Sequence, residues 1–263
     1  AMSKKASKQF KWLRLSSHLI VGLFALLVFT GLSQKATAQL AKGDIAFTAF
    51  NADEDGWSLV NFVAIPANTI IYFTDNEATG TTSFNTGESY FQWNTGSTTI
   101  QAGTVVRFSS VDVTGLASSV GTLTRATVSG SANWGLSTTS EVLYAFLGTS
   151  ASAPTSILAA ISSGDVVTPG DVITNAGLTT GTNAIVIRSS ADYGEYNGAR
   201  SGQTSFANYK SLVFGVANWT VDQNDGTYTT TVPNTTAFTI SNPVNLSVST
   251  NSASETGLTV VTV

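Results

Sequence analysis

Residues 65–76 read Ile-Pro-Ala-Asn-Thr-Ile-Ile-Tyr-Phe-Thr-Asp-Asn and combine a turn with a strand. Pro66 fixes its own φ and Asn68 tolerates left-handed backbone geometry, so the first half has the chemistry of a turn. The four residues from Ile70 to Phe73 are β-branched or aromatic and suit a pleated, half-buried strand. Thr74 and the polar residues after it can hydrogen-bond their own backbone and so end the strand.

The same turn-then-strand pattern recurs later in the chain. Residues 100–108 read IQAGTVVRF, and residues 178–188 are a looser copy with the sequence LTTGTNAIVIR. Each copy places Gly or Asn in the turn and β-branched residues directly after it. The chain is therefore predicted to be a β-protein built from such units.

Short β-type runs between turn signals predict the remaining strands. No segment shows sustained helical spacing of its apolar residues, although residues 156–161 fit a short helix as well as a strand. The expected fold is an all-β domain, a β-sandwich or else an irregular barrel. The expected strands are 43–50, 57–64, 69–74, 103–109, 123–129, 141–147, 156–161, 184–188, 211–216, 228–232 and 236–241.

The first 38 residues have the layout of a cleaved secretory signal peptide. Four lysines and Arg14 form a positive start, residues 18–32 form an apolar core, and Ala36-Thr37-Ala38 matches a cleavage site before Gln39. The alternative is a membrane anchor, but the apolar run is shorter than the roughly 20 residues of a spanning helix. We expect export through the Sec pathway, and a mature chain that is secreted or held at the cell surface without membrane insertion.

Removal of residues 1–38 makes the chain strongly acidic. Six of the 12 Lys and Arg residues lie at or before Lys35, whereas all 16 Asp and Glu residues follow residue 38. The remaining six basic and 16 acidic residues give a net charge of −10, against −4 for the whole chain. Nucleic acid and anionic membranes are therefore poor partners.

The mature sequence also lacks several reactive residue types. The single His and the single Met lie before residue 39, and the chain has no Cys. This composition excludes Ser-His-Asp and Cys-His catalysis, ordinary zinc or copper sites, and disulfides. An exported chain of this length without disulfides needs a large hydrophobic core, which one domain over residues 39–242 can supply.

Asn51, Asp53 and Asp55 resemble the first half of a calcium-binding loop. Their oxygen-bearing side chains alternate and are followed by Gly56, which permits a sharp turn. Position 12 of such a loop would be Phe62 rather than Glu, so the motif is not an EF-hand. Residues 222–226 repeat the pattern more weakly, and in both places an acidic β-turn is the alternative to a calcium site.

Asp75, Glu77 and Glu88 form a second acidic group, close to Tyr90 and Trp93. Two carboxyl groups beside aromatic rings suit a glycosidase, with the rings as a platform for the sugar. The alternative is structural: Asp75 caps a turn, Glu88 accepts backbone hydrogen bonds, and the aromatic side chains pack. The sequence does not give the carboxylate separation on which the enzymatic mechanism depends.

Aromatic residues supply the other candidates for ligand contact. The four Trp residues after residue 39 flank turns or strand ends and are expected mainly in the core. Residues 188–200 form the most polar and aromatic segment and are expected to be an exposed loop. Together with Trp93, its residues Tyr193 and Tyr196 are the predicted ligand-binding side chains.

Several of these motifs resemble a known family. Residues 43–47 (GDIAF), 65–67 (IPA), 72–76 (YFTDN) and 102–104 (AGT), with Glu88 and Trp93, resemble an exported β-domain of large surface proteins from Bacteroidota and cyanobacteria. That domain is distantly similar to the lamin-tail β-sandwich, so the resemblance implies an Ig-like or lamin-tail-like sandwich. It covers residues 42–110 well and has no established activity. Asn68 stands where Gly is the usual turn residue.

The resemblance also addresses the end of the chain. Residues 243–263 look like the start of a Calx-beta or Ig-like repeat, and such proteins commonly end in a type IX secretion sorting domain. The alternative is that these residues add edge strands to the main domain. Because the last predicted strand runs to Val263, we expect further sequence downstream.

These observations favour a non-enzymatic structural or adhesion module, in a matrix or filament, over an enzyme. Calcium at Asn51, Asp53 and Asp55 is its expected cofactor. Other surface or matrix proteins, or further copies of the chain, are its expected partners through exposed strand edges. The alternatives are a carbohydrate-binding module that takes a polysaccharide, and a glycoside hydrolase that uses carboxylates alone.

Overall fold

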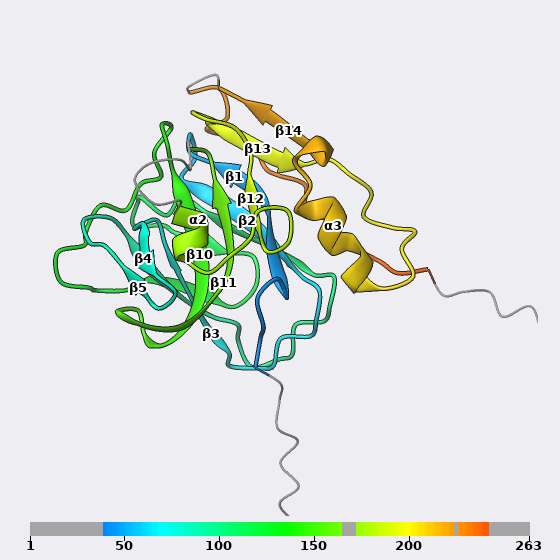
Figure 1. The fold of residues 1–263 in the computed structure, drawn as a ribbon, viewed down its shortest axis with the longest axis horizontal. Helices are drawn as coiled ribbons and strands as arrows, with labels where there is room; N and C mark the ends of the chain where they lie inside the picture. The colour runs from blue at the N-terminus through cyan, green and yellow to red at the C-terminus, as the bar shows by residue number, and fades with distance from the viewer. Residues whose placement is uncertain (1–38, 165–171, 224–225, 242–263) are drawn as a thin grey trace, which may run out of the picture. The chain divides into compact units, whose positions relative to one another are not determined.

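Two six-stranded sheets make up most of the described chain (Figure 1). The computed structural model describes residues 39–164, 172–223 and 226–241. The first sheet has the order β14 (Trp219–Asp222), β13 (Tyr193–Tyr196), β1 (Ile45–Asn51), β2 (Gly56–Asn61), β7 (Val105–Ser109), β8 (Ala117–Ser118). The second has the order β12 (Ala184–Val186), β11 (Ala153–Ser162), β10 (Val142–Ser150), β3 (Ile70–Thr74), β6 (Tyr90–Asn94), β9 (Thr122–Arg125).

The smaller elements lie outside these sheets. They are the hairpin of β4 (Ala78–Gly80) and β5 (Ser83–Phe84), and the short helices α2 (Val172–Asn175), η1 (Phe206–Tyr209), α3 (Lys210–Val213) and η2 (Val216–Asn218). Neighbouring strands in the sheets pair antiparallel, except β11 with β12. No helix in the described part of the chain is both long and apolar enough to cross a membrane.

The turn-then-strand stretch lies at the centre of the second sheet, where β3 pairs with both β10 and β6. Asn68 has φ 57°, and its amide donates to the carbonyl oxygen of Gly96 at 2.7 Å. This confirms the predicted turn. A bridge with two 2.9 Å hydrogen bonds joins Ile65 to Ile100, so the first two copies of the pattern meet at their turns.

The apolar run of β3 is continuous because both faces of the second sheet are covered. Ile71 and Phe73 face the core between the two sheets. Tyr72 points to the opposite face, where it stacks on Phe146 with ring centroids 5.4 Å apart. That outer face is covered by β4, β5 and the segment that contains α2. A strand buried on both sides loses the apolar-polar alternation of a half-exposed one.

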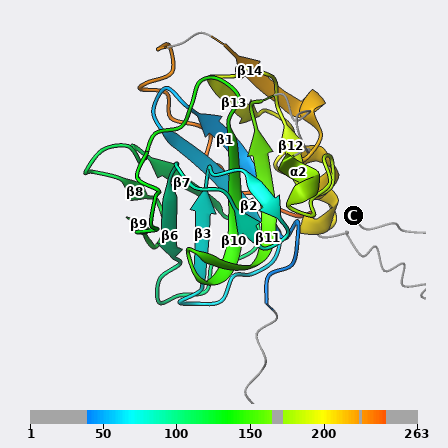
Figure 2. The same ribbon diagram turned by 60° about the vertical axis from the view of Figure 1, so that its left-hand side comes forward.

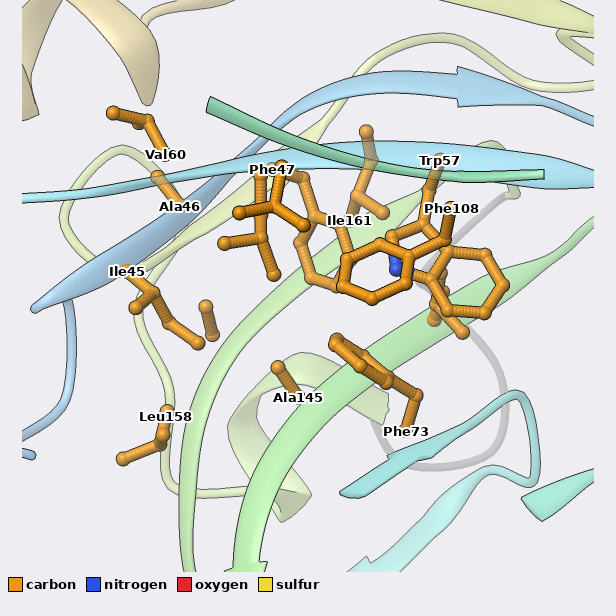
Figure 3. Close-up of a cluster of buried hydrophobic side chains, with 14 of the residues drawn as sticks. Ile45, Ala46, Phe47, Trp57, Val60, Phe73, Phe108, Ala145, Leu158 and Ile161 are labelled. Atoms are coloured by element: carbon orange, nitrogen blue, oxygen red, sulfur yellow. The ribbon is translucent and has the colours of Figure 1, made fainter. Parts of the chain in front are cut away.

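Trp57 on β2 lies at the centre of the core between the sheets (Figure 3). Its ring centroid lies 5.0 Å from that of Phe73 and 5.3 Å from that of Phe108, on the facing sheet and the neighbouring strand respectively. Because residues of both sheets share this core, the fold is an all-β sandwich, as the sequence predicts.

The local signals predict most strands but not all. The predicted strand at 211–216 is wrong, since residues 210–213 form α3, which buries Val213 in the same core. Residues 228–232 form turns rather than a strand, and residues 236–241 contribute only a bridge at Ile240. The ambiguous segment 156–161 belongs to β11. The predicted signal peptide and residues 243–263 lie outside the described residues.

Candidate functional site

Three acidic side chains meet at one end of the second sheet. Because β3 runs antiparallel to both neighbours, its C-terminal end lies beside the N-terminal ends of β6 and β10 (Figure 2). Asp75 directly follows β3, Glu88 lies two residues before β6, and Glu141 directly precedes β10. Three strands that are distant in the sequence therefore each contribute a carboxylate to one place.

The three carboxylates are close enough to share one ligand. One oxygen from each of Asp75, Glu88 and Glu141 lies within 4.8 Å of the others, and no other group of three Asp or Glu side chains in the described chain comes as close. Asp75 is 1% exposed and Glu141 is 4% exposed, whereas Glu88 is half-buried. We refer to these three residues as the carboxylate cluster.

Asp75 has one oxygen held by hydrogen bonds and one without a partner. Its Oδ1 accepts hydrogen bonds from the amide and from the hydroxyl of Ser89, both at 2.7 Å. Its Oδ2 is buried and accepts no hydrogen bond from the described protein. Oε2 of Glu88 is likewise buried without a hydrogen-bond donor. Buried polar atoms are rarely left so, which makes these two oxygens candidates for contact with a ligand.

Glu141 is oriented by the backbone around it. Its Oε2 accepts from the amide of Ser137 at 2.7 Å, and its Oε1 accepts from the amide of Val142 at 2.9 Å. Because each carboxylate oxygen has two lone pairs, both oxygens keep acceptor capacity after these bonds. The backbone around Glu141 thus fixes the orientation of its carboxylate, while both oxygens can still accept a further hydrogen bond or bind a ligand.

A layer of buried neutral residues supports the cluster. Thr74 donates its hydroxyl to the carbonyl oxygen of Ser89 at 2.7 Å, and Asn76 donates its side-chain amide to Oγ1 of Thr74 at 2.9 Å. Oδ1 of Asn76 in turn accepts from the amide of Glu88 at 3.1 Å. These bonds join the end of β3 to the start of β6, so the positions of Asp75 and Glu88 are coupled.

Burial and mutual repulsion raise the pKa of all three carboxyl groups. Burial is the main cause in each case and raises the pKa of Asp75 and of Glu88 to about 7, with repulsion by Glu77 adding to both. Burial, together with repulsion from Asp75 and Glu88, raises the pKa of Glu141 to about 9. Hydrogen bonds from Ser89 oppose the shift at Asp75.

The ion pairs of the described residues lie outside the carboxylate cluster. They join Arg107 to Glu54, and Lys210 to Asp44 at 3.2 Å. Within the described chain, no basic side chain forms an ion pair with the carboxylate cluster. An all-oxygen set of this kind suits hard cations such as Ca²⁺ and Mg²⁺. Of the acids predicted for a glycosidase, Asp75 is buried whereas Glu77 and Glu88 are partly exposed, so the hydrolase stays a prediction.

The predicted calcium residues lie in the hairpin between β1 and β2, and each side chain has a backbone partner. Oδ1 of Asn51 accepts from the amide of Glu54 at 3.1 Å. Oδ1 and Oδ2 of Asp53 accept from the amides of Gly226 and Tyr228, both at 2.8 Å. The structure thus brings the two acidic loops of the sequence together.

Asp55 points in another direction and accepts a hydrogen bond of 2.5 Å from the amide of Leu136. Burial raises the pKa of Asp55 to about 6, and repulsion by Asp112 adds to the shift. Its backbone has φ 55°, as the turn alternative requires. The hairpin therefore serves as an acidic turn, and calcium at Asn51, Asp53 and Asp55 stays a prediction.

The predicted ligand-binding aromatic residues are buried. Trp93 is 0% exposed and donates its Nε1–H to the carbonyl oxygen of Val120 at 2.8 Å. Tyr193 and Tyr196 are 3% and 1% exposed, and both belong to β13 rather than to an exposed loop. A sugar stacks only on an accessible ring face, so the structure does not provide the platform that the sequence suggested at these positions.

Later parts of the chain explain the burial of the two tyrosines, of which Tyr196 belongs to the core between the sheets and Tyr193 does not. Tyr193 stacks on Tyr228 with ring centroids 4.3 Å apart, and Tyr196 stacks on Phe238 at 5.7 Å. Their strand pairs with β1 on one side and β14 on the other. The segment looks polar in sequence because its covering residues, Tyr228 and Phe238, come much later in the chain.

Glu141 is the functional candidate that sequence reasoning missed. It is the first residue of the strand predicted at 141–147 and directly precedes β10, whereas Asp75 and Glu88 flank strands nearer to one another in the chain. The signal in the sequence is an acid at the end of a buried strand, which all three residues share. Its meaning depends on strand order, because only the pairing of β10 with β3 brings Glu141 to Asp75.

Comparison with family models, with curated proteins and with solved structures finds no match for this chain.

Proposed function

We propose that this chain is a non-enzymatic structural or adhesion module of a secreted or cell-surface protein. The observation that carries the proposal is the internal position of its chemically distinctive residues. Trp93 and Tyr196 pack in the core between the sheets, Tyr193 is buried beneath Tyr228, and Asp75 and Glu141 are buried at a strand end. Side chains in these positions stabilise a sandwich rather than receive a substrate.

Location at the cell exterior is proposed from the sequence of residues 1–38 and from the acidic composition that follows. An Ig-like or lamin-tail-like architecture is proposed from the motifs of residues 42–110. The sandwich supports this finer assignment through its two sheets packed face to face over one aromatic core. Calcium in the hairpin between β1 and β2 belongs to the same proposal.

Contact through strand edges is the proposed mode of assembly. In the described chain, β14 and β8 are the outer strands of the first sheet, and β12 and β9 are the outer strands of the second. Edge strands offer unpaired backbone groups that another chain can extend. Surface or matrix proteins, or a second copy of this chain, are the proposed partners.

A carbohydrate-binding module is the second candidate, and one observation favours it. Trp134 and Trp219 are partly buried and pack at the margin of the core, so part of each ring stays accessible. The two rings face different neighbours: Arg125 lies over Trp134 at 5.0 Å, while Trp219 bonds to the carbonyl oxygen of Val213 through Nε1 at 2.8 Å.

The test of export is fractionation of the cells that produce the protein, with intact-mass analysis of the recovered species. We expect a surface-bound or secreted species whose first residue is Gln39. An uncleaved protein in the cytoplasmic fraction would overturn the proposal.

The test of activity compares the exported protein with its Asp75→Asn variant on a panel of polysaccharides and glycoside substrates. We expect no turnover by either protein. Turnover that disappears in the variant would establish the hydrolase instead. Glycan binding that disappears in Trp134→Ala or Trp219→Ala would establish the carbohydrate-binding module.

A further inference from the structure

We propose that Asp75, Glu88 and Glu141 bind one divalent, oxygen-preferring cation, with Ca²⁺ as the preferred ion. The site joins the end of β3 to the starts of β6 and β10. It is separate from the hairpin between β1 and β2, where Asn51, Asp53 and Asp55 have backbone partners. The site is inferred from its geometry and does not depend on adhesion, whereas its expected Kd rests on the proposed export.

The first argument comes from Asp75. Ser89 fixes the orientation of its carboxylate, but only one of the two carboxylate oxygens accepts hydrogen bonds. Two donors from Ser89 hold Oδ1, while Oδ2 is buried without a hydrogen bond in a residue that is 1% exposed. Leaving a buried acceptor unsatisfied is unfavourable, and more so when the group is charged. A cation bound at Oδ2 removes that cost.

Glu88 supplies the second argument. Its Oε2 is also buried without a donor, and the amide of the same residue is fixed by Asn76. Two unpartnered carboxylate oxygens from different strands thus belong to residues whose oxygens lie within 4.8 Å of one another. Convergence of like charges in a buried place is unfavourable unless they are protonated or share a cation.

The spacing and the ligand atoms select the ion. Ca²⁺ binds oxygen at about 2.3–2.6 Å, so two oxygens on opposite sides of it lie up to about 5 Å apart. Mg²⁺ binds at about 2.0–2.1 Å and allows up to about 4 Å. Oxygens that lie within 4.8 Å of one another can all contact one Ca²⁺ ion, which accepts every separation up to that limit. All three ligands are carboxylates, which Zn²⁺ and Cu²⁺ do not favour over nitrogen or sulfur.

The fold explains what the ion would do. β3 forms the centre of the second sheet, and the ion would tie its end to both neighbouring strands. Glu141 also connects the cluster to the segment before β10, because it accepts a hydrogen bond from the amide of Ser137. The preceding residue, Leu136, donates its amide to Asp55. Bound Ca²⁺ would therefore hold this end of the sandwich closed against unfolding.

The experiment is calcium titration of the exported protein after treatment with EDTA, at pH 8, followed by calorimetry and by thermal unfolding. We expect one ion to bind at the carboxylate cluster. Its Kd should fall near the 10⁻⁴–10⁻³ M that is typical, in order of magnitude, of extracellular modules. Calcium in 100-fold excess over Kd should raise Tm by roughly 5–10 °C. Magnesium at the same concentration should raise it less.

Three variants locate the ion. Asp75→Asn and Glu141→Gln should each abolish the calcium-dependent rise in Tm while circular dichroism still shows a β-protein. Glu88→Gln changes a half-buried side chain and gives the same readout if either buried variant fails to fold. Asp112→Asn removes an exposed acid outside the carboxylate cluster and outside the hairpin between β1 and β2, so it is the matched control and should keep the full rise.

Two outcomes would overturn the proposal. One is a titration without heat and with an unchanged Tm, which would mean that the three carboxyl groups are simply protonated in the folded protein. The other is loss of the calcium effect in Asp53→Asn but not in Glu88→Gln, which would place the ion in the hairpin instead.

Discussion

Ser89 donates two hydrogen bonds to the same oxygen of Asp75, one from its amide and one from its hydroxyl, both at 2.7 Å. Both residues are fully buried. This arrangement fixes the orientation of the carboxylate and leaves Oδ2 without a hydrogen bond from the described protein. Positioning of this kind usually tunes a metal site as strongly as the choice of ligand.

Ser89→Ala should weaken calcium binding while the fold persists. The amide bond to Asp75 remains, but loss of the hydroxyl lets the carboxylate rotate, and loss of such a supporting bond typically lowers metal affinity about 10–100-fold. Calorimetric titration measures the change. Ser83→Ala, on the exposed hairpin of β4 and β5, is the control and should bind calcium like the parent protein. Equal affinities of Ser89→Ala and the parent protein would show that Ser89 has no part in positioning.

In EDTA, the protein should lose stability as the pH rises. The pKa values of Asp75, Glu88 and Glu141 are raised from 3.8 or 4.5 to about 7, 7 and 9, so the folded protein holds more protons than the unfolded chain across this range. Their favourable contribution is complete below about pH 4 and is lost as the pH rises through 7 and then 9. Between pH 5 and 8 we expect Tm to fall by at least about 10 °C.

Thermal unfolding at several pH values in EDTA checks this prediction, with Glu141→Gln as the comparison. The variant lacks one ionising group, so its Tm should depend less on pH. Saturating calcium should flatten the profile of the parent protein, because the ion replaces the protons. A Tm that rises with pH in EDTA would contradict the assignment of buried, protonated carboxyls.

Asp75→Asn should change stability in opposite directions with and without calcium. In EDTA at pH 8, Asp75 and Glu88 are mostly ionised, so the variant removes a buried charge that repels Glu88 and its Tm should exceed that of the parent protein. In saturating calcium the parent gains a ligand and the variant does not, so the order reverses. The two melting curves in each condition measure this. A variant that is less stable than the parent in both conditions would indicate a purely structural role for Asp75.

Phe73→Ala should destabilise the sandwich by about 3–5 kcal/mol, because it removes a fully buried ring that contacts Trp57 at 5.0 Å and Phe108 at 5.0 Å. Phe73→Leu keeps most of the volume and should cost less than half as much. Val232→Ala, at a side chain that is 65% exposed, should change little. Denaturant unfolding measures all three. A small effect of Phe73→Ala would mean that the two sheets do not share this core.

The fold follows from local signals where turn chemistry and β-branched runs coincide. Asn68 adopts the left-handed backbone that its residue type favours, and the apolar run after it forms β3. The same reasoning fails at residues 210–213, where β-type side chains form α3. There the apolar side chain of Val213 reaches the core from a helix as well as it would from a strand, and tertiary packing decides.

The candidate site was only partly predictable. Asp75 and Glu88 are near each other in the sequence and stand out as an acidic group beside aromatic residues. Glu141 joins them only because β10 pairs with β3. The order of strands across a sheet cannot be predicted from local sequence composition. Tyr193 and Tyr196 are predicted in an exposed loop but are buried, again because of contacts between distant parts of the chain. The residues that bury them lie beyond residue 226.

Substitution of two glycines allows the free-energy cost of backbone strain to be measured separately from that of a steric clash. Gly103 has φ 86°, and a Cβ there would lie 2.3 Å from the carbonyl oxygen of Phe238 and 2.4 Å from the ring of Phe206. Gly181 has nearly the same φ, 82°, but a Cβ there would meet nothing within 4 Å. The two positions come from the second and third copies of the turn-then-strand pattern.

Gly181→Ala should therefore cost about 1–2 kcal/mol, the strain of a left-handed alanine alone. Gly103→Ala should cost about 1–3 kcal/mol more, because Phe238 and Phe206 must move away from the first sheet. Each additional kcal/mol lowers Tm by roughly 2–4 °C in a domain of this size. Thermal unfolding of both variants in the same buffer measures the difference. Equal losses would show that the segment around Phe238 does not pack against the turn before β7, and would remove the cover of Tyr196 described above.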